Sequence, residues 1–301
     1  MRSMAREVCG FQHTLAVPAH FCGIGLHTGV PVNLALRPAP ANTGIVFKRK
    51  DLEGFAIRAK AANVARVSYA TSLMRKGVLI STTEHLLSAL AALGIDNAVA
   101  ELDNLEVPIM DGSALPFASE VMRAGLRRQR ARQTYLQILR PVEVVEESKR
   151  IAICPSETFR VTYTIDFPHP QIGLQTLEFE ASSATYLGEI APARTFGFFD
   201  EVESLRKAGL VRGGSLQNAV VLSRDQVLNP EGLRFPDEFC RHKILDLVGD
   251  LALLGHPIVG HVVAHRAGHA MHYALVSRLL AERKSWRLVH SSDIQPQTSA
   301  A

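Results

Sequence analysis

One row of titratable side chains stands out in the second half of the chain. His242, Asp246 and Asp250 follow one another at i, i+4 and i+8 within an otherwise apolar segment. If that segment is a helix, the three side chains share one face, opposite an arc of Ile, Leu and Val. A His and an Asp four residues apart on a helix can hold one metal ion. They can equally form an ordinary ion pair worth about 0.3 kcal/mol.

The helix is predicted from its boundary signals. Pro236 and Asp237 indicate a start, with Asp237 as the N-cap, and Gly255 followed by Pro257 indicates a stop. Gly249 lies between the titratable residues, where the missing side chain lets another segment approach closely. A helix this apolar packs against a core, so its charged side chains need partners from elsewhere in the chain.

A second candidate group is the pair Glu84 and His85. An apolar strand at 78–80 precedes it, and a leucine-rich helix follows as far as Gly94. Ser81 and Glu84 fit a capping box, in which the glutamate only stabilises the start of the helix. Alternatively, Glu84 is a general base beside a metal ligand, His85. The local pattern favours the cap and leaves the base open.

The composition is that of a globular, mildly basic protein. The chain has 301 residues, which predicts two domains, and a net charge of +4 with a pI near 9.0 suits a phosphate-bearing ligand. No signal peptide and no apolar stretch of about 20 residues is present, so we expect a cytoplasmic protein without a membrane span. Four scattered cysteines are interpreted as reduced thiols: Cys9, Cys22, Cys154 and Cys240.

An arginine-rich run marks the predicted domain boundary. Its arginines are residues 123, 127, 128, 130 and 132. Such a run is usually a solvated linker, and contact with RNA or phosphate is the alternative. We therefore predict a first domain at 1–126, a linker at 127–134, a second domain at 135–290 and a disordered tail at 291–301.

The second half repeats the first in outline. We expect strands over 13–48, 97–102, 136–145, 151–153, 159–167 and 258–264, and further helices over 116–123, 201–208 and 270–282. Leu93-Gly94 and Leu254-Gly255 both close leucine-rich helices that lead into strands. Superposing them sets His85 over Asp246, so each copy of the unit offers one ligand to a shared cleft.

Several motifs, taken in order, carry a family resemblance. They are Gly25-Leu26-His27-Thr28-Gly29, Arg37-Pro38-Ala39-Pro40-Ala41-Asn42-Thr43-Gly44, Glu84-His85-Leu86, Leu93-Gly94-Ile95-Asp96-Asn97, Pro108-Ile109-Met110-Asp111-Gly112-Ser113-Ala114, Ala193-Arg194-Thr195-Phe196-Gly197-Phe198, His242-Lys243 with Asp246 and Gly249-Asp250, and Gly268-His269-Ala270. The ordered set resembles the UDP-3-O-acyl-N-acetylglucosamine deacetylases, the zinc enzymes of lipid A synthesis. The resemblance covers residues 13 to 290.

This resemblance implies an α+β fold of two similar domains. Each domain is a mostly antiparallel sheet layered with helices, and the active site lies at their junction. One catalytic zinc ion per chain would be held by His85, His242 and Asp246, which leaves a fourth position open for water. Glu84 would take the proton of that water.

The resemblance also implies roles for residues around the metal. His269 would stabilise the oxyanion and protonate the leaving amine, Asp250 would orient His269, and Thr195 would donate to the oxyanion. The implied substrate contacts are Lys243 to the pyrophosphate, Asp166 and Phe167 to the uracil, Arg266 to a phosphate, and Phe196. The implied reaction removes the N-acetyl group of a nucleotide-sugar lipid precursor, the committed step of lipid A biosynthesis. We expect a monomer with no nucleic-acid partner.

Two positions depart from the family pattern. Arg266 stands where relatives commonly carry Lys, which keeps the charge but changes the donor geometry. His272 stands where Asn is expected, so a second histidine lies near His269. Five histidines crowd this region (His256, His261, His265, His269 and His272), and the family pattern selects His269 as the acid.

The acyl chain of such a substrate needs shelter from water. The segment 195–215 is more apolar than an ordinary loop, through Phe196, Phe198, Phe199, Leu205, Leu210 and Val211. We predict that it forms the wall of an acyl passage. The alternative is that these side chains belong to the domain core.

Two other functions compete with the deacetylase. One is a non-catalytic RNA-binding protein, motivated by the pI and the arginine run, which gives no reason for Glu84-His85 and His242…Asp246 to coexist. The other is a zinc amidohydrolase with an unrelated N-acyl substrate. Metal analysis separates the first alternative from the deacetylase, and a substrate panel separates the second.

Overall fold

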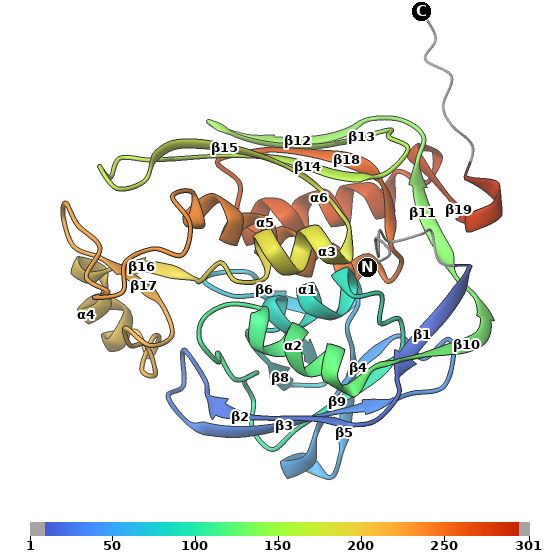
Figure 1. The fold of residues 1–301 in the computed structure, drawn as a ribbon, viewed down its shortest axis with the longest axis horizontal. Coiled ribbons are helices and arrows are strands. Elements are labelled where there is room, and N and C mark those ends of the chain that lie inside the picture. Colours follow the sequence, from blue (N-terminus) through green and yellow to red (C-terminus); the bar gives the residue numbers. More distant parts are fainter. Residues whose placement is uncertain (1–9, 295–301) are drawn as a thin grey trace, which may run out of the picture.

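The computed structural model describes residues 10–294 and places helices between two larger sheets (Figure 1). A five-stranded sheet has the order β2 (Ala19–Ile24), β3 (Pro31–Pro38), β9 (Ala98–Leu102), β4 (Ile45–Arg49), β5 (Phe55–Arg58). A seven-stranded sheet has the order β12 (Val142–Glu146), β13 (Lys149–Cys154), β18 (Ile258–His265), β11 (Thr134–Ile138), β19 (Trp286–His290). In it, β14 (Phe159–Phe167) also pairs with β18, and β15 (Gly173–Glu180) pairs with β14.

Both sheets are mostly antiparallel. In the first, only β4 and β9 pair in parallel; in the second, β18 pairs in parallel with β11 and with β14. The helices α1 (Glu84–Ala92) and α2 (Leu115–Ala124) pack on the first sheet, and α5 (Glu238–Leu251) and α6 (His269–Ala281) on the second (Figure 1). This arrangement confirms the predicted α+β fold class.

The two halves share an order of elements. A helix, a central strand and a second helix follow one another as α1–β9–α2 and again as α5–β18–α6. In each half the central strand has an antiparallel neighbour on one side and a parallel neighbour on the other. This agrees with the repeat predicted from the sequence.

Smaller elements lie around this frame. The strands are β6 (Val64–Arg66), β7 (Ser72–Arg75), β8 (Val78–Ile80), β16 (Phe196–Phe198) and β17 (Val220–Leu222), and the helices are α3 (Ser183–Thr185) and α4 (Phe199–Lys207). Short 3-10 turns occur at Lys50–Leu52, Ala61–Asn63, Ala252–Leu254, Arg283–Ser285 and Ser291–Asp293, and a π turn at Tyr186–Ile190. No helix within residues 10–294 is long and apolar enough to cross a membrane.

The arginine-rich run is a strand, so the prediction of a solvated linker at 127–134 is wrong in its secondary structure. Strand β10 (Leu126–Arg132) pairs antiparallel with β1 (Phe11–Leu15). Its arginines are exposed, whereas Gln129 hydrogen-bonds to Asn97 and to a backbone carbonyl. The pairing with β1 therefore determines the extended conformation of this segment. The domain boundaries themselves stay a prediction.

The tail prediction is tested only in part. Ser291–Asp293 forms a short 3-10 turn, and residues 295–301, like Cys9, lie outside the described residues. Cys22, Cys154 and Cys240 are free thiols, as predicted.

Asp237 occupies the predicted N-cap position, but neither predicted side chain caps the backbone of its helix. Helix α5 has Asp237 at its N-cap position, but the carboxylate accepts from the Arg241 side chain instead of capping the backbone. Helix α1 has Thr83 at its N-cap, so Ser81 and Glu84 form no capping box. Glu84 is the first helical residue, and its buried Oε2 accepts from the backbone N of Thr71 at 3.1 Å. The capping-box prediction is therefore wrong.

Gly249 is the point at which α1 and α5 meet. A Cβ atom placed on Gly249 would lie 2.1 Å from the carbonyl oxygen of Glu84. No side chain fits at that distance, because the obstacle is backbone and cannot rotate away. The predicted close approach is confirmed, and it brings Glu84 and His85 beside the titratable face of α5.

Gly249→Ala should therefore destabilise the protein by at least about 2 kcal/mol, because the added methyl separates the two helices. Urea unfolding measures this. The matched control is Gly188→Ala, since nothing lies within 4 Å of a Cβ at Gly188. Equal stability of the two variants would show that α1 and α5 do not need the close contact.

Candidate metal centre and active site

Three buried side chains from the facing helices converge at the junction of the halves. His85 lies on α1, and His242 and Asp246 lie one turn apart on α5. Asp246 Oδ1 is 3.3 Å from His242 Nε2 and 3.6 Å from His85 Nε2. Two atoms that each lie about 2.05 Å from a tetrahedral zinc ion are about 3.4 Å apart, so the spacing fits a metal site. The three residues have ligand atoms within 4.8 Å of one another.

The hydrogen bonding of these groups tests the fit further. Asp246 Oδ1 is buried and has no hydrogen-bond partner in the described part of the chain. His242 Nδ1 lies 3.0 Å from the carbonyl oxygen of Ala193, which can only accept, so Nδ1 carries the proton and Nε2 turns its lone pair toward Asp246. With no proton between them, the carboxylate oxygen and the imidazole lone pair repel each other. A bound cation would satisfy both.

The electrostatics keep His242 and Asp246 in their metal-binding forms. Burial lowers the pKa of His242 to about 3, so its imidazole is neutral. Burial alone would raise the pKa of Asp246, but Lys243 and the nearby imidazoles outweigh it and hold the pKa well below its usual range. Lys243 Nζ lies 2.8 Å from Asp246 Oδ2 and leaves Oδ1 to the metal position.

Glu84 and His269 face each other beside His85, His242 and Asp246. Glu84 Oε1 and His269 Nε2 are 3.9 Å apart. Burial raises the pKa of Glu84, against the effect of the two nearby imidazoles. Burial would lower the pKa of His269, but Asp250, Asp246 and Glu84 outweigh it and raise the pKa to about 9. A protonated imidazole thus faces a basic carboxylate, as general acid and base require.

Asp250 holds His269 in place. Its Oδ2 accepts from His269 Nδ1 at 2.7 Å, and its Oδ1 accepts from the Thr71 hydroxyl at 2.5 Å. Burial would raise the pKa of Asp250, but the two histidines it binds outweigh this and lower the pKa to about 2. The structure therefore brings together Asp250 and His269 as the resemblance implied.

His272 lies behind Asp250, away from the cavity. Its Nδ1 is 2.8 Å from Asp250 Oδ2 and its Nε2 is 2.9 Å from the hydroxyl of Tyr163, and the residue is fully buried. Asp250, His269 and His272 also have the composition of a metal site. Both imidazoles, however, lie at hydrogen-bond distance from one carboxylate oxygen, so we interpret the group as a hydrogen-bonded triad.

A cavity of about 350 Å³ opens onto the site. Among the predicted residues, its lining includes Glu84, His85, Thr195, Phe196, His242, Lys243, Asp246 and His269. His256, His261, His265 and His272 are not among the lining residues, so the geometry supports the choice of His269. Lys243 also lies over the Phe196 ring, with Nζ 5.5 Å from its centroid.

The remaining predicted substrate contacts, Asp166, Phe167 and Arg266, are not among the residues that line the cavity. Arg266 and Asp166 form an ion pair with 3.7 Å between Nη1 and Oδ2. The ring of Phe167 packs edge-on against Phe196 at 5.7 Å between centroids. Phe167 therefore contacts a residue of the cavity lining, Phe196, whereas Asp166 and Arg266 contact each other.

The residues of the predicted acyl wall lie in different environments. Phe196 and Phe198 pack against the hydrophobic core, as in the core alternative, while the side chain of Phe199 is exposed. The following loop docks on the Gly25–Gly29 turn, with Gly213 N donating to Leu26 O at 3.0 Å. Leu26 lines the cavity. A passage between this loop and the turn stays a prediction.

Two supporting residues were missed by the sequence analysis. Thr71 joins Glu84 to Asp250 through its backbone N and its hydroxyl, and no spacing pattern marks it. Glu106 is buried and accepts from His27 N, Thr28 N and two hydroxyls, so it fixes the Gly25–Gly29 turn. Because Gly25 contacts this carboxylate, any side chain there would collide with it. The glycine-rich motif was the available signal.

Comparison with known proteins gives the class and the family. A family model described as UDP-3-O-acyl N-acetylglycosamine deacetylase matches residues 12–281. Three relatives described as UDP-3-O-acyl-N-acetylglucosamine deacetylase come from Solibacter usitatus, Phenylobacterium zucineum and Neisseria gonorrhoeae. The first is 51% identical over 97% of this chain and 98% of its own length. The second is 50% identical over 92% of this chain and 96% of its own length. The third is 46% identical over 94% of each.

Together with the fold, these matches define an α+β deacetylase, a hydrolase of acyl groups. The chain belongs to the UDP-3-O-acyl N-acetylglycosamine deacetylase family. The family supports the deacetylase hypothesis over the RNA-binding one, and it confirms the resemblance found in the sequence.

His269 should make the metal-free protein's stability depend on pH. Its pKa is raised from 6.5 to about 9 on folding, which corresponds to about 3 kcal/mol of folding stability. This stabilisation is fully present below about pH 6.5 and is lost as the pH rises through about 9. The stability advantage of the parent over His269→Gln should shrink by about this much between pH 6 and pH 10. Urea unfolding after chelation measures it. An advantage that does not change with pH would contradict the charged state of His269.

Proposed function

We propose that this protein is a zinc-dependent hydrolase that removes the N-acetyl group of UDP-3-O-acyl-N-acetylglucosamine and releases acetate, the committed step of lipid A biosynthesis. One observation carries the proposal: a His-His-Asp group with an unpartnered carboxylate oxygen stands beside a facing carboxylate and imidazole. Family membership supplies the substrate. We further propose that the protein acts in the cytoplasm as a monomer.

His85, His242 and Asp246 would hold one zinc ion. When bound, the ion would lower the pKa of a water molecule toward neutrality and polarise the amide carbonyl. The chain contributes a neutral imidazole at His242 and an ionised carboxylate at Asp246, so neither of these two has to lose a proton before metal binds.

Glu84 would take the proton of the attacking water. Its Oε2 is fixed by the Thr71 backbone N, and its Oε1 is free to face the cavity. The raised pKa of this buried carboxylate makes it a stronger base than an exposed glutamate.

His269 would be the general acid that faces Glu84. Its Nδ1 proton is held by Asp250, so the Nε2 proton points toward Glu84 and the cavity. From there the imidazolium can stabilise the oxyanion and then give its proton to the departing amine. Thr195 lines the same cavity and would donate its hydroxyl to the oxyanion.

The surface next to the cavity would bind the nucleotide. Lys243 at the rim would meet the pyrophosphate by exchanging its Asp246 contact for a phosphate oxygen, and Arg266 would contact a phosphate. Asp166 and Phe167 would contact the uracil, and Phe196 would lie beneath the sugar end. The acyl chain would lie near Leu26 and the docked loop.

Glu84→Gln should separate a structural glutamate from a base. The amide keeps the size of the side chain and can still accept from the Thr71 backbone N, but it cannot take a proton. We expect stability within about 1 kcal/mol of the parent and a kcat at least about 100-fold lower. Urea unfolding and steady-state kinetics measure the two. A nearly unchanged kcat would remove Glu84 as the base.

The function is tested by acetate release from UDP-3-O-acyl-N-acetylglucosamine and from UDP-N-acetylglucosamine. Burying six methylenes is worth about 5 kcal/mol before ordering costs, so loss of the acyl chain should lower kcat/KM at least about 100-fold. Chelation should abolish turnover and zinc should restore it. Equal kcat/KM for both substrates would favour a general amidohydrolase, and turnover that survives chelation would exclude the zinc mechanism.

A further inference from the structure

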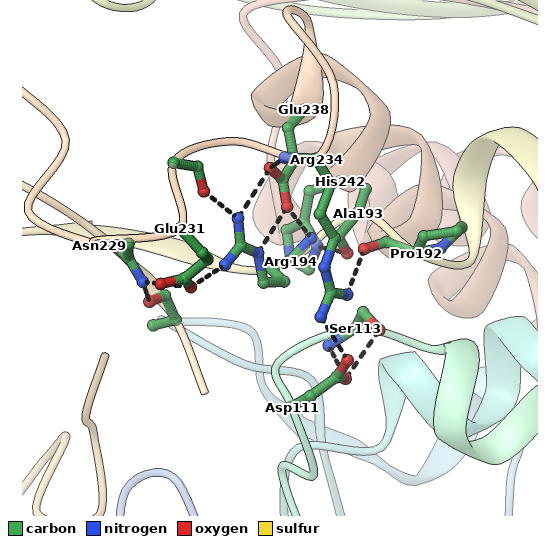
Figure 2. Close-up of polar contacts among 12 residues, drawn as sticks. Asp111, Ser113, Pro192, Ala193, Arg194, Asn229, Glu231, Arg234, Glu238 and His242 are labelled. Atoms are coloured by element: carbon green, nitrogen blue, oxygen red, sulfur yellow. Dashed lines mark hydrogen bonds and ion pairs between the residues drawn. The ribbon is translucent and has the colours of Figure 1, made fainter. Parts of the chain in front are cut away.

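One short segment supplies three parts of the site. The carbonyl oxygen of Ala193 accepts a hydrogen bond from Nδ1–H of His242. The next site residues along the chain, Thr195 and Phe196, line the cavity. Small shifts of this segment would alter the metal ligand and the cavity at once. Arg194, in the middle of it, does not line the cavity; its guanidinium points toward Glu231 and Glu238 (Figure 2).

Arg194 is almost fully buried, with 3% of its side chain exposed. Its Nε donates to Glu238 Oε1 at 2.8 Å and its Nη2 to Glu238 Oε2 at 3.2 Å, so the guanidinium binds both oxygens of that carboxylate. Two further N–H groups reach Glu231 at 2.6 Å and the carbonyl of Gly232 at 2.7 Å (Figure 2). Four of the five N–H groups of the guanidinium are thus hydrogen-bonded.

Glu238 is the anchor on the helix. It is the first residue of α5, one turn before His242, and its side chain is fully buried. Besides the guanidinium it accepts the backbone N of Arg194 at 3.0 Å and of Arg234 at 2.6 Å. Segment 193–194 is thus attached to α5 at two points one turn apart: Arg194 at Glu238, and Ala193 at His242.

The same segment is attached to the first half of the chain. Thr195 N donates to the carbonyl of Gly112 at 2.8 Å. Arg234 donates to Pro192 O at 2.7 Å and to Asp111 Oδ2 at 2.9 Å (Figure 2). The Pro108–Ala114 motif, for which the catalytic residues give no reason, therefore fixes the segment from the opposite side.

We propose that Arg194 and Glu238 are positioning residues of the metal centre. The pair fixes the Ala193 carbonyl where it accepts a hydrogen bond from Nδ1–H of His242, which leaves Nε2 with its lone pair facing Asp246. It fixes Thr195 at the cavity in the same way. The inference deepens the proposed function in its zinc and deacetylase parts, but the ligand geometry can be tested without substrate.

A merely structural pair would give a different result. If Arg194 and Glu238 only stabilised the fold, removing their bond would lower the free energy of unfolding and leave the folded site unchanged. A positioning role changes metal affinity and the His242 tautomer in protein that is still folded, because supporting contacts of metal-ligating histidines contribute about 10–100-fold in affinity.

The experiment compares Arg194→Lys and Glu238→Gln with the parent. Lysine keeps the charge without the two-pronged donor, and glutamine keeps the size without the charge. The matched control is Arg49→Lys at the end of β4, a buried arginine that likewise binds both oxygens of one carboxylate, Asp51, at 2.8 and 2.5 Å. Zinc dissociation constants from chelator competition should rise about 10-fold or more in both variants and stay within about 3-fold in the control.

Two further readouts accompany the zinc titration. In metal-free parent protein, ¹⁵N NMR of the imidazoles should show His242 as the Nδ1–H tautomer, and both variants should show a mixture. In the zinc-loaded variants, kcat should fall at least about 10-fold while KM changes less than about 3-fold. Far-UV circular dichroism and urea unfolding establish which variants are folded.

The possible results test the positioning role of Arg194 and Glu238 separately from the proposed function. Folded variants with parental zinc affinity and parental His242 tautomer would overturn it, and so would an Nε2–H tautomer in the parent, a result that needs no variant. If one variant does not fold, the other and the parent spectrum decide. A parent that binds zinc as expected but does not deacetylate the substrate would contradict the proposed function alone.

Discussion

The structure depends on the burial of several ionisable side chains between two helices. Glu84 and His85 come from α1, His242, Asp246 and Asp250 from α5, and all five are buried. Taking such groups out of water is costly unless each one has a partner. The contact of α1 with α5 at Gly249 brings the groups close enough to compensate one another. His269 at the start of α6 completes the set, because it carries a positive charge close to all three carboxylates of the cluster, Glu84, Asp246 and Asp250.

The rest of the fold keeps this cluster rigid. The two sheets form the outer layers, so the helices between them are covered on both sides (Figure 1). Around the cluster, a second set of buried contacts fixes the side chains: Thr71 on Glu84 and Asp250, the Ala193 carbonyl on His242, and the Arg194–Glu238 pair behind that carbonyl. A polar network of this kind specifies one arrangement because any shift leaves a buried group unpaired.

Much of this could be predicted from the sequence because it depends on local periodicity. The α5 face with His242, Asp246 and Asp250 follows from a spacing of four residues, and the close approach at Gly249 from a missing side chain. The predictions failed where a distant partner overrode a local pattern. The arginine-rich strand β10 is set by its pairing with β1, and the Ser81–Glu84 capping box gave way to the Thr71 contact of Glu84. Arg194 and Glu238 carry no spacing signal, since they meet only after folding.

The central claim is that His85, His242 and Asp246 hold one zinc ion and leave a position for water. X-ray absorption spectroscopy of the protein loaded with one zinc per chain tests it most directly. The account predicts a shell of nitrogen and oxygen ligands at about 2.0–2.1 Å, with the multiple-scattering signature of two imidazoles, and four ligands in total. A sulfur contribution at about 2.3 Å, or a shell without imidazole, would place the metal elsewhere and contradict the account.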